Sequence, residues 1–557
     1  MKNFNFILVI IAIAAIGCSN KDDMRLSQII DNATETLKPL NKQAALAYWN
    51  GTTTGQSQFF EEYSRLSLEI SKFYSNKDIF EELKEIKERN RVSDPTLKRE
   101  LEILYNNFLS NQTDSSLLEK IINKTSELEQ KYASYRAIVE GKEVSDNRIV
   151  SILSESTNNK LLEEAWSAHK EIGPIVAEDI VELVKLRNKV ANSLGFDNFH
   201  TMTLSLSDQD PNTISDLFDQ LDSLTKDSFN NLKAEMDALF SKKYGVEIGN
   251  LMPWHYQCRF FQESPQLYPV DLDSYYRGKN LEELTATFFN SIGLDIDQML
   301  KNSDLYEKPG KNQHAYCIDI DTEGDVRVLA NISDNEQWMG TMLHEFGHAV
   351  YSFGHSYPEN PYFLRNAAHP FTTEAVAMIF GRLSRNPEWM RQMLNLSDDE
   401  INKISEDCHK SLRLQQLVFS RWSQVMYRFE KEMYANPDQD LNTLWWCLVE
   451  KYQGLKKPKG RDKPDWATKV HIALYPCYYH NYQLGELLAS QMHYYILENL
   501  YESNHISNQS YIGNKEIGKW MTDKIFVPGM KYNWNQMIQN ATGEKLTPKY
   551  YAKQFVQ

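Results

Sequence analysis

The stretch HAYCIDIDTEGDVRVLANISDNEQWMGTMLHEFGHAVYSFG, residues 314–354, decides the fold class of this chain. Its first part alternates apolar and polar residues over 314–320 and again over 326–330. A turn that contains Gly324 separates the two runs, and this pattern is typical of a β-hairpin. The stretch therefore begins with the one clear β signal of the chain.

The second part of the same stretch predicts an amphipathic helix. Apolar residues recur every three or four positions from Trp338 to Val350, the spacing of one helical face. Ser333 and Glu336 fit a capping box at its start, and Gly354 is expected to end it. A small hairpin is thus followed at once by a long helix.

Outside this stretch the pattern is helical almost throughout. Apolar residues keep helical spacing over 24–240 and from Thr373 to the C-terminus, with breaks expected near Pro387, Pro437, the loop 456–458 and Pro528. No linker or low-complexity segment divides the 557 residues. The sequence predicts a large, mainly α-helical fold with a small sheet, as one folded unit.

The charge of the chain argues against nucleic acid as a partner. The formal net charge is -16, whereas proteins that bind phosphate backbones need clustered Lys and Arg. We therefore expect no nucleic-acid partner.

The N-terminus predicts export and a lipid anchor. Residues 1–18 combine a positive start with an apolar run too short to span a bilayer, and small residues precede Cys18. This resembles a bacterial lipoprotein signal, in which Cys18 is lipidated; an ordinary cleaved signal is the alternative. Residues 19–26 are expected to form a polar tether, and 27–557 the helical domain. The protein would then be held to the cell envelope, at the outer membrane or facing the periplasm, by its lipid alone.

Five further cysteines are scattered along the chain without a C-x-x-C pair. This argues against a disulfide framework and against a cysteine metal site, although one or two bridges could form. They are Cys258, Cys317, Cys408, Cys447 and Cys477.

The predicted helix carries the sequence His344-Glu345-Phe346-Gly347-His348. A spacing of four puts both imidazoles on one helical face, where their nitrogens can converge on one zinc ion. Glu345 projects beside them and can serve as a general base for the attacking water. These residues predict a hydrolytic zinc site; the alternative is a solvated helix face.

A catalytic zinc needs a third protein ligand. Glu374, expected in the first turn of the next helix, is one candidate, and Glu359 is another. A Glu in a first turn also stabilises the helix dipole without any metal. The residues alone leave this choice open.

Two motifs resemble known zinc peptidases. The H-E-x-x-H motif, with a Glu at the position of Glu374, is similar to the thimet oligopeptidase family and to the angiotensin-converting-enzyme family. The segment WWCLVEKYQGL, residues 445–455, resembles the W-W-x-L-x-x-K-Y-Q-G-L of the latter. This resemblance implies an all-helical, zincin-type metallopeptidase with a deep channel, with zinc bound by His344, His348 and Glu374.

The resemblance continues after this segment. Lys469 and His471 match that family's K-F-H-I, which implies that Lys469 binds the substrate's C-terminal carboxylate and that His471 stabilises the tetrahedral intermediate. Two tyrosines should share these roles. One insertion assigns Tyr479 to the carboxylate and Tyr482 to the intermediate, and we prefer it because it retains both phenols.

Without that insertion the first tyrosine would be Tyr478, and Asn481 would replace the second. His314 and Ala315 resemble the family's His-Ala on an edge strand that pairs with the substrate backbone.

The chain also departs from the family pattern. Met378 stands where the family has an Asp that supports a zinc-binding His. The family's carboxylate-binding Gln would fall near Tyr256 or Gln257, in a register that the sequence does not fix.

The sequence thus predicts an enzyme with one zinc ion per chain that hydrolyses short peptides. A peptidyl-dipeptidase that releases C-terminal dipeptides is the first hypothesis, and an oligopeptidase that cuts internally is the second. A lipid-anchored binding or scaffold protein with a structural zinc is the third, although such a site has no use for Glu345. The residues give no support for a chloride site.

Overall fold

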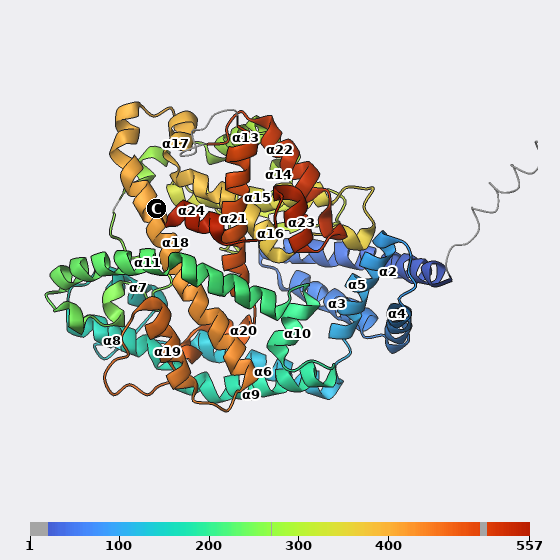
Figure 1. Cartoon of the computed structure of the whole chain (residues 1–557), viewed down its shortest axis with the longest axis horizontal. Helices are drawn as coiled ribbons and strands as arrows, with labels where there is room; N and C mark the ends of the chain where they lie inside the picture. Colours follow the sequence, from blue (N-terminus) through green and yellow to red (C-terminus); the bar gives the residue numbers. More distant parts are fainter. Residues whose placement is uncertain (1–20, 269, 502–509, 557) are drawn as a thin grey trace, which may run out of the picture.

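The computed structural model describes residues 21–268, 270–501 and 510–556, and it is mainly helical, as the sequence predicts (Figure 1). The α-helices are α2 Lys21–Thr54, α3 Ser57–Tyr74, α4 Lys77–Arg89, α5 Pro95–Ser110, α6 Ser115–Ser134, α7 Asp146–Glu155, α8 Asn159–Lys170, α9 Ile172–Ser193, α10 Phe199–Leu206, α11 Pro211–Tyr244, α12 Asp273–Tyr276, α13 Leu281–Ser291, α14 Asp297–Asn302, α15 Glu336–His355, α16 Pro370–Gly381, α17 Pro387–Leu394, α18 Asp398–Ala435, α19 Leu441–Gln453, α20 Val470–Leu474, α21 His480–Asn499, α22 Lys515–Met521, α23 Trp534–Thr542 and α24 Lys549–Phe555. The strands are β1 Ala137–Val139, β2 Lys142–Val144, β3 Tyr316–Asp319 and β4 Val326–Leu329.

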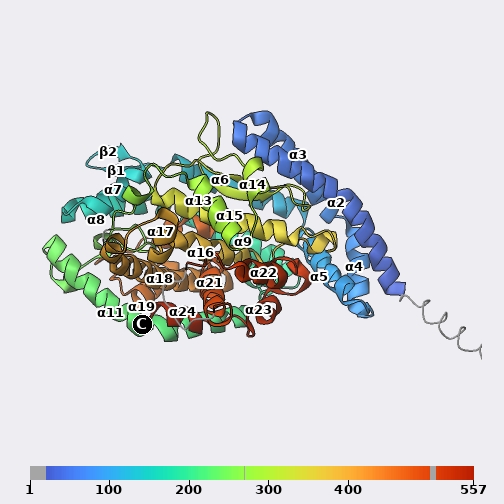
Figure 2. The ribbon, with the colours of Figure 1, turned by 90° about the horizontal axis from the view of Figure 1, so that it is seen from above.

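The helices form groups that long helices connect. In Figure 1, α13 to α17 and α22 to α24 lie above α6 to α11, α19 and α20, while α2 to α5 lie at one side. The long helix α18 packs on α17 and α21 as well as on α11 and α19, so it joins the upper and lower groups. Seen from above, α2 and α3 run along one edge of the molecule (Figure 2).

One large apolar core holds most of the chain together. It includes buried side chains from Leu128 to Phe555. The N-terminal helices α2, α4 and α5 have a smaller cluster of their own, which Phe363 joins from the loop between α15 and α16. The site helices α15, α16 and α21 all contribute to the large core, which fixes their relative positions.

Both strand pairs are antiparallel hairpins. In the predicted hairpin, Tyr316 pairs with Leu329 and Asp319 pairs with Val326, so β3 is shorter than expected and excludes His314 and Ala315. The Asn312 side chain accepts a hydrogen bond from the His314 amide at 2.9 Å, and this turn bends the chain before the strand begins.

The sequence pattern did not predict the second hairpin, β1 and β2, because each of its strands has only three residues.

Two helix starts differ from the prediction. Asn335, and not Ser333, caps α15 by accepting from the Trp338 amide at 2.9 Å. Glu336 is unavailable for a capping box because its carboxylate accepts from Ser384 and Arg385. Helix α16 begins at Pro370, earlier than predicted, since a proline suits the first helical position. Glu374 therefore lies in the second turn of α16.

Only part of the predicted N-terminal organisation falls on residues that the structure describes. Residues 1–20, and with them the expected signal and Cys18, lie outside the described residues. The rest of the expected tether is the start of α2: Leu26 is buried, and the Arg25 side chain bonds to Glu85 of α4 at 2.8 Å.

None of the helices that the structure describes contains an apolar stretch of the length that a membrane span requires. The five cysteines among the described residues are free.

Candidate active site

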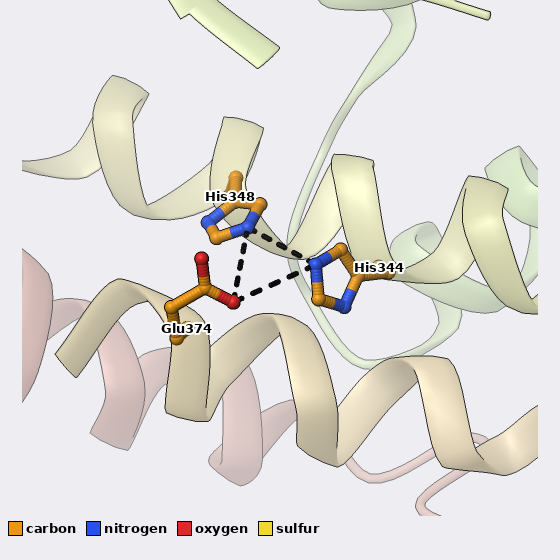
Figure 3. Close-up of side chains that lie close together, drawn as sticks. All are labelled: His344, His348 and Glu374. Atoms are coloured by element: carbon orange, nitrogen blue, oxygen red, sulfur yellow. Dashed lines mark hydrogen bonds and ion pairs between the residues drawn. The ribbon is translucent and has the colours of Figure 1, made fainter. Parts of the chain in front are cut away.

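The two histidines of α15 face one another at one turn's separation. Their Nε2 atoms lie 3.2 Å apart, and both rings point toward Glu374 on α16 (Figure 3). One Glu374 carboxylate oxygen lies 3.8 Å from Nε2 of His344 and 3.9 Å from Nε2 of His348. The three side chains thus form a triangle between two helices.

Small residues let the two helices approach closely enough for this triangle. A Cβ on Gly347 of α15 would lie 2.8 Å from Ala377 Cα, and one on Gly381 of α16 would lie 3.3 Å from His344 Cβ. A larger side chain at Gly347 would push α16 away, because the nearest atom is backbone. These close contacts hold Glu374 opposite the histidines.

The triangle fits a zinc ion. The three ligand atoms lie within 4.8 Å of one another, and ligands about 2.0–2.2 Å from a tetrahedral zinc would be about 3.3 Å apart. Burial lowers the pKa of His344 to about 4 and, with the neighbouring His344, that of His348 to about 3. Both imidazoles are therefore neutral near pH 7, the form that binds a metal.

Of the two candidate carboxylates, only Glu374 belongs to this group. Glu359 is exposed in the loop between α15 and α16.

Sequence reasoning missed a hydrogen bond that orients one ligand. The Thr373 hydroxyl lies 2.8 Å from Nδ1 of His348, the ring nitrogen that would not face the metal. Such contacts fix the ring orientation of zinc-binding histidines. Thr373, next to Glu374, thus supplies a supporting contact at a site where Met378 cannot. Nothing in the motif marks Thr373, because Thr in a helix start is usually a cap.

Glu345 lies between the histidine pair and the hairpin. Its side chain is 9% exposed, and the Cys317 amide of β3 donates to its carboxylate. Burial, and then the charge of Glu374, raise the pKa of Glu345 to about 8. A carboxylate with a raised pKa can both take up and return a proton near neutral pH.

Lys469 lies buried in a cage of aromatic rings. Its ammonium is 5.3 Å from the ring centres of Phe260 and Tyr479, and it donates to the Gln262 carboxamide at 2.5 Å. Burial lowers the pKa of Lys469 to about 8. No carboxylate pairs with this cation among the described residues within 4 Å, so it can bind an anionic group from outside.

Neither Tyr256 nor Gln257, where the sequence left the register of the expected Gln open, provides the amide that contacts Lys469. Tyr256 bonds instead to Asp237 at 2.6 Å, and the Gln257 carboxamide accepts from the Gln266 amide at 3.0 Å. Gln262 instead accepts the hydrogen bond from Lys469, and the chain adopts left-handed backbone conformations at Gln257 and Phe261 before it.

The tyrosines separate into two positions. Tyr479 lies beside Lys469. Tyr478 and Tyr482 lie near Glu374, whose charge, after burial, raises the pKa of both phenols. Asn481 accepts from Gln209 at 2.7 Å and is buried. Tyr479 is thus the tyrosine beside Lys469, while Tyr478 and Tyr482 both lie near Glu374, and their assignment to catalytic roles stays a prediction.

His471 lies on the Lys469 side, against Tyr479. Its ring lies 5.1 Å from that of Tyr479, and burial, followed by Lys469, lowers its pKa to about 4. His471, Lys469 and Gln262 line a cavity of about 710 Å³. A neutral imidazole there can donate a hydrogen bond. His314 and Ala315 precede β3, so their pairing with a substrate strand stays a prediction.

Comparison with known proteins agrees with this geometry. The family model described as "Angiotensin-converting enzyme" matches residues 20–550. The chain is similar to angiotensin-converting enzyme of Mesocricetus auratus, with 22% identity over 71% of this chain and 32% of that protein. It is also similar to Carboxypeptidase 1 of Bacillus subtilis, with 24% identity over 48% of this chain and 55% of that protein. The chain spans about a third of the length of the first of these relatives.

Another relative, from Caenorhabditis elegans, is named an inactive angiotensin-converting enzyme-related protein; it shares 21% identity over 41% of this chain and 25% of its own length.

Proposed function

The chain belongs to the angiotensin-converting-enzyme family of peptidases, and on that premise we propose that it is a zinc-dependent peptidyl-dipeptidase acting on short peptides. One observation carries the proposal: His344, His348 and Glu374 converge beside Glu345, so a metal-binding group and a base share one site. One relative is named inactive, so membership of the family alone does not imply activity. The proposal of activity therefore depends on the residues of the site.

His344, His348 and Glu374 would hold one zinc ion per chain. When bound there, zinc would polarise the scissile carbonyl and acidify the attacking water. The Glu345 carboxylate takes a proton from that water and returns it to the leaving amine. No covalent intermediate with the protein is needed.

Tyr482 and His471 would stabilise the negative charge that develops on the carbonyl oxygen. Tyr482 is supported by its place near Glu374, and His471 by the contact of its ring with Tyr479, whose ring also contacts Tyr482. A single donor to such an oxyanion contributes about 2.7–4 kcal/mol to the barrier reduction.

Release of dipeptides follows from a carboxylate clamp. The caged Lys469 ammonium, with Tyr479 and Gln262 beside it, is suited to a peptide's C-terminal carboxylate. If the terminus is held there and the scissile bond lies at the zinc ligands, the cleaved fragment has a fixed length. An oligopeptidase would not need this clamp, which is why we place internal cleavage second.

A scaffold protein with a structural zinc is the alternative of another class. Structural zinc sites are usually closed by four protein ligands, whereas a group of three ligands such as His344, His348 and Glu374 leaves a position for water. The buried base Glu345 has no role in such a protein.

We also propose that the protein is exported and lipid-anchored through Cys18. The sequence of residues 1–18 is the support for this proposal. Membrane fractionation of the wild type and of Cys18→Ala tests it, and a wild type found only in the soluble fraction would refute the anchor.

The cleavage mode is tested by mass spectrometry of the products from matched peptides with free and amidated C-termini. We expect dipeptides from the free acids and little cleavage of the amides. Internal fragments in equal yield from both would favour the oligopeptidase.

A further inference from the structure

A second cavity, of about 360 Å³, adjoins the zinc-binding residues on the side of α18. His344 and Glu345 both line it, so a group bound there would lie next to the reacting centre. Gln337 and Thr341 extend this wall toward the start of α15, because residues four apart stack on one helical face. The volume is at the lower end of the range for ligand pockets and suits one side chain.

The opposite wall is polar and comes from three other elements. Gln416 of α18 donates to the Glu486 carboxylate of α21 at 3.0 Å, and Glu486 also pairs with Arg382, which follows α16. Gln416 is 2% exposed, and its carbonyl oxygen has no hydrogen-bond partner among the described residues. A buried acceptor without a partner costs about 1–3 kcal/mol, which a ligand donor would recover.

The charges around this cavity are balanced. Arg382 pairs with Glu486, and the Arg385 guanidinium pairs with Glu336 at 2.8 Å. Apart from Glu345, each charged wall residue therefore has a partner of opposite sign. A charged substrate side chain would have to break one of these pairs or enter without a counter-ion.

Few apolar side chains contribute to the walls. Met378 and Leu412 are the apolar side chains of the lining, whereas its other side chains carry hydrogen-bonding groups, apart from its glycines. An aromatic or aliphatic side chain would leave the Gln416 carbonyl oxygen without a hydrogen-bond partner.

We propose that this cavity is a specificity pocket for a neutral, hydrogen-bonding side chain of the peptide, best fitted by glutamine or asparagine. The carboxamide of such a side chain can donate to the Gln416 carbonyl oxygen. It can also accept from the Thr341 hydroxyl, which otherwise donates to the Gln337 carbonyl of its own helix. Gln416 and Thr341 are then specificity-determining residues. This inference rests on the proposed peptidase function, since it concerns a residue adjacent to the scissile bond.

The test uses the full-length, zinc-loaded protein and sets of free-acid peptides. In one set the residue before the cleaved bond varies, and in the other set the residue after it varies. The varied residue is glutamine, leucine, phenylalanine, glutamate or lysine. We expect kcat/KM for glutamine to exceed that for leucine by at least about tenfold at one of these positions. Wild-type preference for leucine or phenylalanine at every position would overturn the inference while leaving the peptidase proposal intact.

Gln416→Met should reduce that preference to near unity, mainly by lowering kcat/KM for the glutamine peptide. Gln424→Met is the matched control, because Gln424 is also buried on α18 and hydrogen-bonded but does not line the cavity. Zinc content and melting temperature establish that both variants are folded. An unchanged preference in a folded Gln416→Met, or an equal loss in the control, would refute the role of Gln416.

If Gln416→Met fails to fold, the wild-type ratios and Thr341→Val decide the question, with the same expected direction. Absence of cleavage of every peptide by zinc-loaded wild type would instead overturn the proposed function and this inference with it.

Discussion

The Lys469 ammonium donates to the Gln262 carboxamide at 2.5 Å, although 207 positions separate the two residues in sequence. The contact brings the loop before α12 to the start of α20, within the cavity that His471 also lines. A buried cation with an amide as its hydrogen-bond partner is prepared for an anion that arrives with the substrate. The clamp predictions follow from this pair.

Lys469→Ala should impair cleavage of a free-acid peptide by about 2–5 kcal/mol in kcat/KM, because the substrate carboxylate loses its counter-ion. The matched amide, already a poor substrate, should hardly change. Peptide kinetics on both substrates measure this. Equal losses on acid and amide would mean that Lys469 acts in folding. Lys463→Ala is the control, because Lys463 is a half-buried lysine that pairs with Glu171.

The same clamp should depend on pH. Burial lowers the pKa of Lys469 to about 8, so in the free enzyme the ammonium is charged below that pH and neutral above it. We expect kcat/KM for acid peptides, relative to that for the matched amides, to fall as pH rises through about 8, because kcat/KM reports ionisation of the free enzyme and only the acid peptides use Lys469. The ratio of acid to amide cleavage, measured across this pH region, isolates the effect from other ionisations. A ratio that stays flat there would argue against the clamp.

The identity of the third ligand can be tested with two carboxylates. Glu374→Ala should lose bound zinc, because three protein ligands hold a catalytic ion. Glu359→Ala should keep it, since Glu359 is exposed and outside the triangle. Metal analysis of both purified variants provides the measurement. Full zinc retention by Glu374→Ala would remove Glu374 from the site.

Thr373 should matter through the histidine it contacts. Thr373→Val keeps the size of the side chain but removes the hydroxyl that lies 2.8 Å from His348, so zinc affinity should fall about 10–100-fold. Competition with a zinc chelator measures this, and Thr373→Ser should restore affinity. Unchanged affinity in a folded Thr373→Val would show that this hydroxyl does not support the zinc ligand.

Local patterns in the sequence predicted much of the fold and the metal-binding face of the site helix. Helical spacing marked α15, and the spacing of His344 and His348 marked the metal-binding face, because both depend on one helix. Gln262 and Thr373 could not be predicted, since their roles depend on how distant segments meet. Gln262 meets Lys469 from 207 positions away, and Thr373 meets His348 across the close contact of α15 and α16 at Gly347.

The shifted boundaries have a similar cause. Asn335 replaced Ser333 as the cap because tertiary contacts with Ser384 and Arg385 engage Glu336. Such contacts are invisible to a local capping pattern.

The most direct test of the account is Glu345→Gln, assayed for zinc content and for turnover on one preparation. Glu345 is proposed as the base and not as a ligand, so the variant should keep one zinc ion per chain while kcat falls by about 10²–10⁴-fold. Wild-type turnover by a zinc-loaded Glu345→Gln would contradict the proposed mechanism at its centre.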